Sequence, residues 1–404
     1  MPREQHLIVA AGVCAALHVA KLPPAVAALQ QALAITLVQA GFLLSIVQVA
    51  GMLLGAVMGA WADGLGPRRS MLLGLALLAA ASAAGASASG AAMLMALRAL
   101  EGVGFLLVVL PGPGWLRQVA PPPTVVAALG RWSAYMPLAT ALALGIGPAA
   151  VEALGWRGWW VALAVVTTAM ALALARGTRD VRGMAAAAAH PTQLAAAGES
   201  TWQRLAQTLS RRGPWVVAGV FLFYAGQWLA VIGFLPTLLR QVGTPTWQVG
   251  LAGAGAAAVN MIGNLGAGRL QQRGVRPQVI VAMACTVMAL GANGFYAEGW
   301  PLPLRLAAVA AFSLFGGLIP ATLFTLAVRV APSPQTTGTT VGWMQQGSAM
   351  GQFFGPPAVA WAAAHTGGWA AAGWVTATAA MLALLLMRML PADALHAANP
   401  PATR

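Results

Sequence analysis

The sequence predicts an all-α membrane protein with twelve transmembrane helices, arranged as two pseudo-symmetric bundles of six helices. This prediction rests on composition, on recurring apolar runs and on a repeat between the two halves. Hydrophobic residues make up 59% of the 404 residues and charged residues only 7%, whereas soluble globular proteins carry about 25% charged residues. A surface so poor in charge requires lipid as its solvent.

The apolar runs have the length of about 20 residues that a helix needs to span a bilayer. They must be helical because each unpaired backbone group in hydrocarbon costs several kcal/mol, and they lack the alternation of a membrane β-barrel. The predicted spans cover residues 6–28, 36–60, 70–90, 92–112, 124–151, 158–176, 214–237, 246–269, 277–297, 304–328, 338–364 and 368–390.

A stretch with soluble character divides the chain into two halves. We predict an N-terminal six-helix bundle over residues 1–176, a cytoplasmic linker over 177–213, a C-terminal six-helix bundle over 214–390 and a cytoplasmic tail over 391–404. Within the linker, residues 201–212 either form a short interfacial helix or belong to a flexible connection between the bundles.

The two halves repeat one another, which indicates a duplicated six-helix unit. The landmarks recur in the same order and at a nearly constant spacing: Gly66 and Gly274, Arg68 and Arg276, the segments that begin at Arg117 and Arg329, and Gly147-Pro148 and Gly355-Pro356.

The formal net charge of +14 would suggest a nucleic-acid partner in a soluble protein. Here most Lys and Arg residues fall in loops on one side of the spans, as the positive-inside rule describes. We therefore expect no nucleic-acid partner, and a multi-pass protein of the cell (inner) membrane with both termini in the cytoplasm. Cys14 and Cys285 both lie in spans, so we expect neither a disulfide nor a metal site.

The loop over residues 59–69 reads GAWADGLGPRR. It is similar to the signature G-x-x-x-D-R-x-G-R-R of the major facilitator superfamily, with Gly64 in place of the usual basic residue. Arg98 followed by Gly102 and Gly104 resembles the second motif of that family. The resemblance covers nearly the whole chain, and in overall texture it is closest to the cyanate/nitroimidazole-type permease branch. It implies transport by alternating access of the two bundles around a site near the bilayer midplane.

The resemblance also implies a conformational latch in this loop, formed by Gly59, Asp63, Gly66, Arg68 and Arg69. Asp63 lies at a helix end, where it can accept hydrogen bonds from the exposed amides of the next helix. Arg68 and Arg69 can pair with carboxylates or with the neighbouring bundle, in contacts that hold one conformation and break in the other. The alternative is a solvated turn with ordinary cytoplasmic arginines.

The first span holds two ionisable side chains, which are costly inside a membrane and are functional candidates by default. His18 and Lys21 are three residues apart and therefore share a helix face. We expect Lys21 to attract an anionic substrate, with His18 as its hydrogen-bond partner or as a proton carrier. The alternative is a lysine that snorkels to the outer headgroups.

Arg98 and Glu101 form a second pair, again three residues apart on one helix. Pairing lowers the cost of their burial without abolishing it. Low dielectric favours the neutral form of a carboxyl group, so Glu101 is a candidate proton site. The alternative is a structural ion pair near the outer interface.

The remaining candidates for substrate binding are neutral: Tyr135, Tyr224, Gln227, Asn260 and Gln345. Such side chains either line a polar pathway or tie helices together, at roughly 1 kcal/mol per hydrogen bond.

These features predict a secondary active transporter and not an enzyme, because no H-E-x-x-H, G-x-S-x-G or P-loop motif is present. We expect proton-coupled uptake of a small, anionic solute by a monomer in the lipid bilayer, with the proton as coupling ion and no cofactor. A drug or metabolite exporter that works by proton antiport is the alternative. A polytopic membrane enzyme or a channel would be a different class, and the duplicated plan argues against a channel.

Overall fold

A computed structural model of the whole chain describes residues 3–53, 65–121, 128, 131–132, 134–178, 201–333 and 336–390. Every regular element in these residues is a helix. The first half contains α1 (Arg3–Ala20), η1 (Pro23–Ala25), α2 (Val26–Leu33), α3 (Leu37–Ser45), η2 (Ile46–Gln48), α5 (Pro67–Gly85), α6 (Ala91–Val109), α7 (Gly112–Val119) and α9 (Tyr135–Gly177). The second half contains α11 (Thr201–Leu209), α12 (Arg212–Gln241), α13 (Thr246–Gln272), α14 (Pro277–Tyr296), α15 (Leu302–Gly316), α16 (Leu318–Val330), α17 (Thr337–Thr366) and α18 (Ala370–Met387).

Each of the twelve predicted spans is mainly helical where the structure describes it; the first span is interrupted at Lys21 and Leu22, and the third extends past the end of α5 at Gly85. Eight helices of the described residues are by themselves long and apolar enough to cross a membrane. One of them, α9, contains residues 135–151 of the predicted span 124–151 and all of the predicted span 158–176, and it changes direction at Gly155, whose φ is 69°. Only glycine adopts this backbone conformation without steric cost, so the short connection between these spans depends on it.

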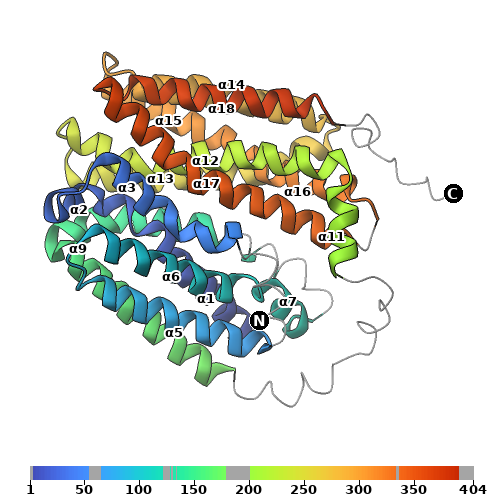
Figure 1. Cartoon of the computed structure of the whole chain (residues 1–404), viewed down its shortest axis with the longest axis horizontal. Coiled ribbons are helices and arrows are strands. Elements are labelled where there is room, and N and C mark those ends of the chain that lie inside the picture. The colour runs from blue at the N-terminus through green and yellow to red at the C-terminus, as the bar shows by residue number, and fades with distance from the viewer. Residues whose placement is uncertain are drawn as a thin grey trace.

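The helices run side by side in two groups, the first half of the chain against the second (Figure 1). Between the groups, α3 packs on α17 and α9 packs on α13. Glycines allow the close approach: a Cβ on Gly250 of α13 would lie 2.5 Å from the carbonyl oxygen of Gly145. A hydrogen bond from Gln48 Nε2 to Gln352 Oε1, 3.0 Å long, also joins the halves.

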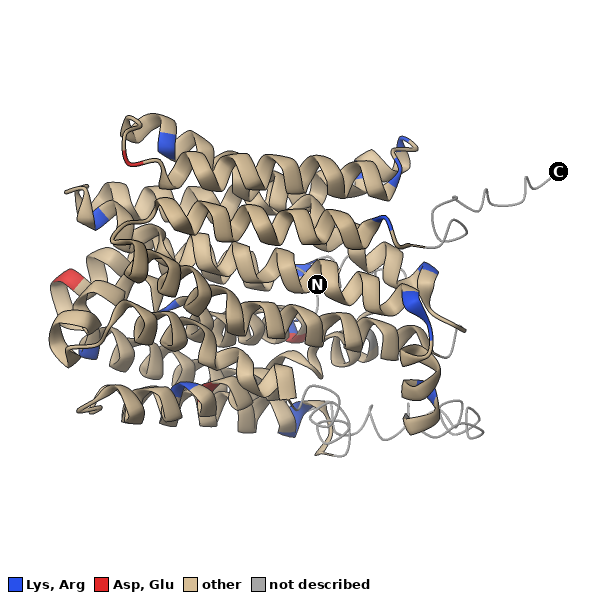
Figure 2. Cartoon of the chain, turned by 45° about the horizontal axis from the view of Figure 1, so that its top comes forward, with Lys and Arg blue, Asp and Glu red and all other residues tan. Residues whose placement is uncertain are grey.

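The described charged residues lie mostly at the two ends of the helices, with more Lys and Arg at the end where α11 lies (Figure 2). At the opposite end, the carboxylate of Glu152 on α9 accepts hydrogen bonds from Arg240 of α12 and from the hydroxyl of Thr246 on α13. We call this end the Glu152 end. These contacts join the two halves there and are partly exposed to solvent.

The predicted domain boundaries stay a prediction. Most of the predicted linker, residues 179–200, and the predicted tail, 391–404, lie outside the described residues. The possible interfacial helix corresponds to α11, in which Trp202 is 77% exposed. Trp215 Nε1 donates to the carbonyl oxygen of Leu209 at 2.9 Å and thereby ties the end of α11 to α12.

Candidate functional site

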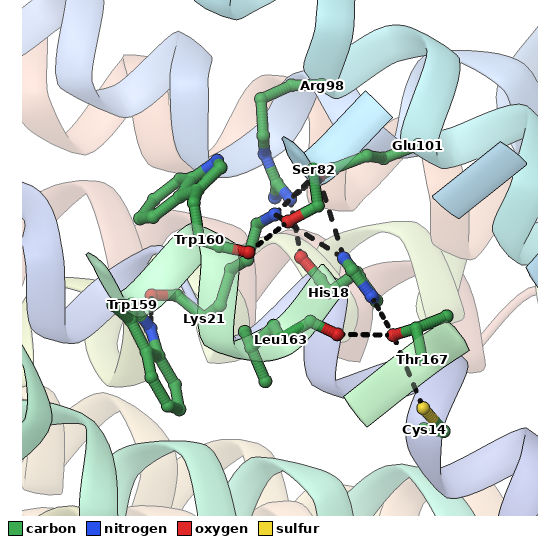
Figure 3. Close-up of polar contacts among 10 residues, drawn as sticks. All are labelled: Cys14, His18, Lys21, Ser82, Arg98, Glu101, Trp159, Trp160, Leu163 and Thr167. Atoms are coloured by element: carbon green, nitrogen blue, oxygen red, sulfur yellow. Dashed lines mark hydrogen bonds and ion pairs between the residues drawn. The ribbon is translucent and has the colours of Figure 1, made fainter. Parts of the chain in front are cut away.

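Four ionisable side chains from two helices meet in the interior of the first half: His18 and Lys21, from α1 and the turn after it, and Arg98 and Glu101 of α6 (Figure 3). We call them the charge cluster. Their side chains are at most 1% exposed, and α5 and α9 cover the other sides with Ser82 and Trp160. The sequence analysis predicted two separate pairs, His18 with Lys21 and Arg98 with Glu101. The structure brings the two pairs together.

Glu101 lies at the centre of the charge cluster. Its Oε1 atom lies 2.5 Å from Lys21 Nζ, and its Oε2 atom lies 2.6 Å from Arg98 Nη1. His18 Nδ1 is 3.7 Å from the same Oε1 atom. One carboxylate therefore bridges two cations in a site without solvent contact, where charge-assisted hydrogen bonds are strong.

Lys21 uses all three of its donor positions inside the protein. Its ammonium group donates to Glu101, to Ser82 Oγ at 2.8 Å and to His18 Nδ1 at 3.4 Å. It also lies 4.5 Å from the centre of the Trp160 ring, a distance at which a cation and an aromatic face attract. The alternative of a lysine that snorkels to the headgroups is therefore wrong.

The hydrogen bonds of His18 define its neutral tautomer. The hydroxyl of Thr167 donates to the carbonyl oxygen of Leu163 at 2.7 Å, so its oxygen accepts from His18 Nε2, 2.7 Å away. The other ring nitrogen, Nδ1, then accepts from Lys21. A proton added to His18 would end the hydrogen bond that Nδ1 accepts from Lys21, since Nδ1 would become a donor, with Glu101 Oε1 3.7 Å away as the nearby acceptor.

The end of α1 explains why the cluster forms at this level of the helix. Pro23 and Pro24 lack the amide hydrogens that would continue the helical pattern, and α1 ends at Ala20. Side chains bind two carbonyl oxygens at this helix end, one in the last turn of α1 and one just after it: Arg98 Nη1 donates to His18 O, and Trp159 Nε1 donates to Lys21 O at 3.0 Å. The irregular turn is thus fixed by α6 and α9.

The predicted latch lies partly outside the described residues, which do not include Gly59 and Asp63. Gly66 has a φ of 78° and precedes the first residue of α5. Arg68 binds the end of α9: its Nε donates to Thr178 Oγ1 at 3.0 Å, and its Nη2 donates to Ala175 O at 2.9 Å. Arg69 is exposed. Arg68 therefore caps a helix C-terminus of its own half.

The neutral candidates do not form one site. In the second half, Asn260 Nδ2 donates to the Tyr224 hydroxyl at 3.4 Å and to Ser313 O at 2.9 Å. Gln227, one turn along α12 from Tyr224, is buried, and its amide has no hydrogen-bond partner among the described residues. Gln345 is exposed on α17.

Tyr135 lies apart from these residues, at the start of α9, where its ring centre is 5.0 Å from that of Trp132. It belongs to an apolar cluster of the first half that also contains Trp115 and Met136.

Sequence reasoning missed three partners of the charge cluster: Ser82, Trp160 and Thr167. They are neutral residues in apolar helices, and nothing in the sequence marks them as functional.

A groove of about 620 Å³ lies between α1 and α9. It is lined mainly by apolar side chains, and Gln5 and Arg131 also line it. No group of three metal-ligating side chains occurs within the described ranges.

The fold resembles solved structures of membrane transporters over nearly the whole chain. The chain is similar to a D-xylose–proton symporter (15% identity, TM-score 0.72, 96% of this chain and 98% of that one). It is similar to a bacterial homologue of the human lysosomal transporter Spinster in an inward-facing, occupied conformation (17%, TM-score 0.76, 98% and 100%). It is also similar to the inward-open xylose transporter of E. coli (12%, TM-score 0.72, 96% and 95%).

No curated protein sequence matches the chain significantly, and none of these comparisons supports the cyanate/nitroimidazole-type branch. The sequence model of the Major Facilitator Superfamily matches residues 8–356. Together with the two helical groups and the neighbouring structures, this match establishes that the chain is a multi-pass membrane transporter and not an enzyme, and that it belongs to the Major Facilitator Superfamily.

Proposed function

We propose that this transporter takes up a small anionic solute together with protons, by alternating access of its two halves across the cell membrane. The main support for this proposal is Glu101, a fully buried carboxylate that bridges Lys21 and Arg98. Ionisable groups at such positions in membrane proteins commonly form proton relays and substrate pathways.

The charge balance of the cluster favours symport. When Glu101 is ionised, it neutralises part of the charge of Lys21 and Arg98. When it binds a proton, both ion pairs weaken and the cluster gains one positive charge. A more positive cluster attracts an anion more strongly, so proton binding and anion binding favour each other, and this coupling is reciprocal. Proton antiport of a cationic or neutral drug does not follow from this arrangement.

The fold is compatible with this proposal, since a neighbouring structure of the same architecture is a sugar–proton symporter. The predicted orientation, with both termini in the cytoplasm, belongs to the proposal, as do a monomeric state and the absence of a cofactor. The greater number of basic residues at the α11 end supports that orientation.

The proposal is tested with purified protein in two steps. A thermal-shift screen compares small anions with cations and neutral solutes, because a ligand stabilises the state that it binds. Uptake of a labelled hit into proteoliposomes is then measured with an acidic exterior. We expect accumulation that a protonophore abolishes.

The variant Glu101→Gln separates coupling from movement. We expect it to lose proton-driven accumulation and to retain exchange of labelled for unlabelled solute, which needs no net proton movement. Accumulation by the variant equal to that of the wild type would overturn the role of Glu101. Proton-driven extrusion of a cationic solute would identify an exporter instead.

A further inference from the structure

The charge cluster holds more positive than negative charge. Lys21 and Arg98 are cations, and Glu101 is the single carboxylate within ion-pair distance of them in the part of the chain that the structure describes. His18 is neutral in the hydrogen-bond arrangement found above. One positive charge is therefore left over among side chains that are at most 1% exposed. An uncompensated charge in such a place is costly.

Arg98 has a free edge inside the protein. Its Nη1 atom donates to His18 O and to Glu101 Oε2, whereas Nε and Nη2 are buried and have no hydrogen-bond partner in the described part of the chain. In the planar guanidinium group, the N–H bonds of Nε and Nη2 lie on the same side and point the same way. This pair of donors is the fork that binds a carboxylate through two parallel hydrogen bonds.

Trp160 adds a third unused donor beside the charge cluster. Its Nε1 atom is buried and has no partner among the residues that the structure describes, and its ring centre lies 4.5 Å from Lys21 Nζ. The indole packs where α5 and α6 meet: a Cβ on Gly85 would lie 3.1 Å from Nε1 and 3.7 Å from Leu94 Cδ1. Leu94 lies one turn before Arg98 on α6. Buried donors without a partner require an explanation, such as a bound ion or water.

We propose that the free edge of Arg98 binds a small monovalent anion, either chloride or the carboxylate group of a small solute, with the indole N–H of Trp160 as a further donor. One anion would neutralise the extra positive charge and satisfy the unused donors together. The site lies within the first half of the molecule. It goes beyond the proposed function, because it requires neither proton coupling nor a direction of transport.

The test measures the thermal stability of the purified transporter in chloride, bromide and formate, each titrated against bulky gluconate at constant ionic strength and pH. We expect saturable stabilisation by the three small anions. Arg98→Lys keeps the charge but loses the fork, so the apparent affinity should fall at least tenfold, and Trp160→Phe should weaken it less. Arg157→Lys is the control, since Arg157 donates to Ala88 O and stacks on Trp156; it should retain the wild-type response.

A crystal structure in bromide gives a second measurement that does not depend on variants. We expect an anomalous difference peak within hydrogen-bond distance of Arg98 Nε and Nη2. Stability that is the same in all four anions, or an ordered water at the edge in bromide, would overturn the proposal. Labelled formate that exchanges across a membrane would identify the anion as a transported solute, and chloride that binds without exchange would identify it as resident. A failure of this site would leave the protonophore test of the proposed function unaffected.

Discussion

Lys21 Nζ lies 2.5 Å from Glu101 Oε1, and this contact joins the irregular end of α1 to the middle of α6. Arg98 competes for the same carboxylate from one turn away. Removal of Lys21 and removal of Glu101 therefore leave different charges behind. Without Lys21, Arg98 and Glu101 remain as a neutral pair. Without Glu101, two buried cations face each other.

This inequality predicts the order of two stability changes. Glu101→Gln should lower the free energy of unfolding by about 3–5 kcal/mol, the range for removing one partner of a buried ion pair. Lys21→Met should cost only about 1–2 kcal/mol, because the lost contacts are hydrogen bonds and the remaining charges balance. Chemical unfolding of both variants in mixed detergent micelles, in gluconate buffer, measures the difference. A larger loss for Lys21→Met would contradict the charge balance described here.

A second prediction concerns Thr167, whose oxygen accepts from His18 Nε2. Thr167→Val keeps the shape of the side chain and leaves the imidazole N–H buried without an acceptor, so it should cost about 1–3 kcal/mol in unfolding free energy. Thr167→Ser retains the hydroxyl and is the matched control, with a smaller loss. Equal losses for the two variants would show that packing of the methyl group matters and the hydrogen bond does not.

Much of the fold follows from the sequence. Apolar runs of membrane-spanning length predict twelve spans because in lipid the backbone must satisfy its own hydrogen bonds, and the described part of each span is mainly helical. The i, i+3 spacing predicted that His18 lies beside Lys21, and Arg98 beside Glu101.

The meeting of these two pairs could not be predicted, because it depends on how α1 packs on α6. Neither could the roles of Ser82 and Thr167, since a hydroxyl in a transmembrane helix commonly bonds to its own backbone. Thr167 does so and in addition accepts from His18. The sequence places residues on helix faces, and tertiary packing decides which faces meet.

A third prediction separates Arg68 from Arg69. Arg68 caps the end of α9 through Thr178 and Ala175, whereas Arg69 is exposed. Arg68→Gln should lower the free energy of unfolding by about 1–2 kcal/mol, since it removes a charged donor from the Ala175 carbonyl and the Thr178 hydroxyl at a helix C-terminus. Arg69→Gln should change stability by less than about 0.5 kcal/mol, as is usual for surface substitutions. Chemical unfolding measures both, and equal changes would contradict the structural distinction.

The last prediction concerns the contact between the halves near the Glu152 end. Gly250 of α13 lies so close to Gly145 of α9 that a larger side chain cannot fit without moving the helices apart. Gly250→Leu should therefore destabilise the conformation in which this end is closed and shift the population toward one in which it is open, since packed interfaces are bistable rather than continuously deformable. Gly255 lies on the same helix, and an added Cβ there would meet no neighbouring atom within 4 Å, so Gly255→Leu is the control variant.

Spin labels at Glu152→Cys and Arg240→Cys report the separation of the halves at this end. Both native cysteines, Cys14 and Cys285, are buried, which limits labelling elsewhere. We expect Gly250→Leu to add a longer distance to the distribution measured by pulsed electron paramagnetic resonance, and Gly255→Leu to leave it unchanged. An unchanged distribution in Gly250→Leu would show that α9 and α13 separate without passing through this contact, and that the glycines serve only to pack the closed state.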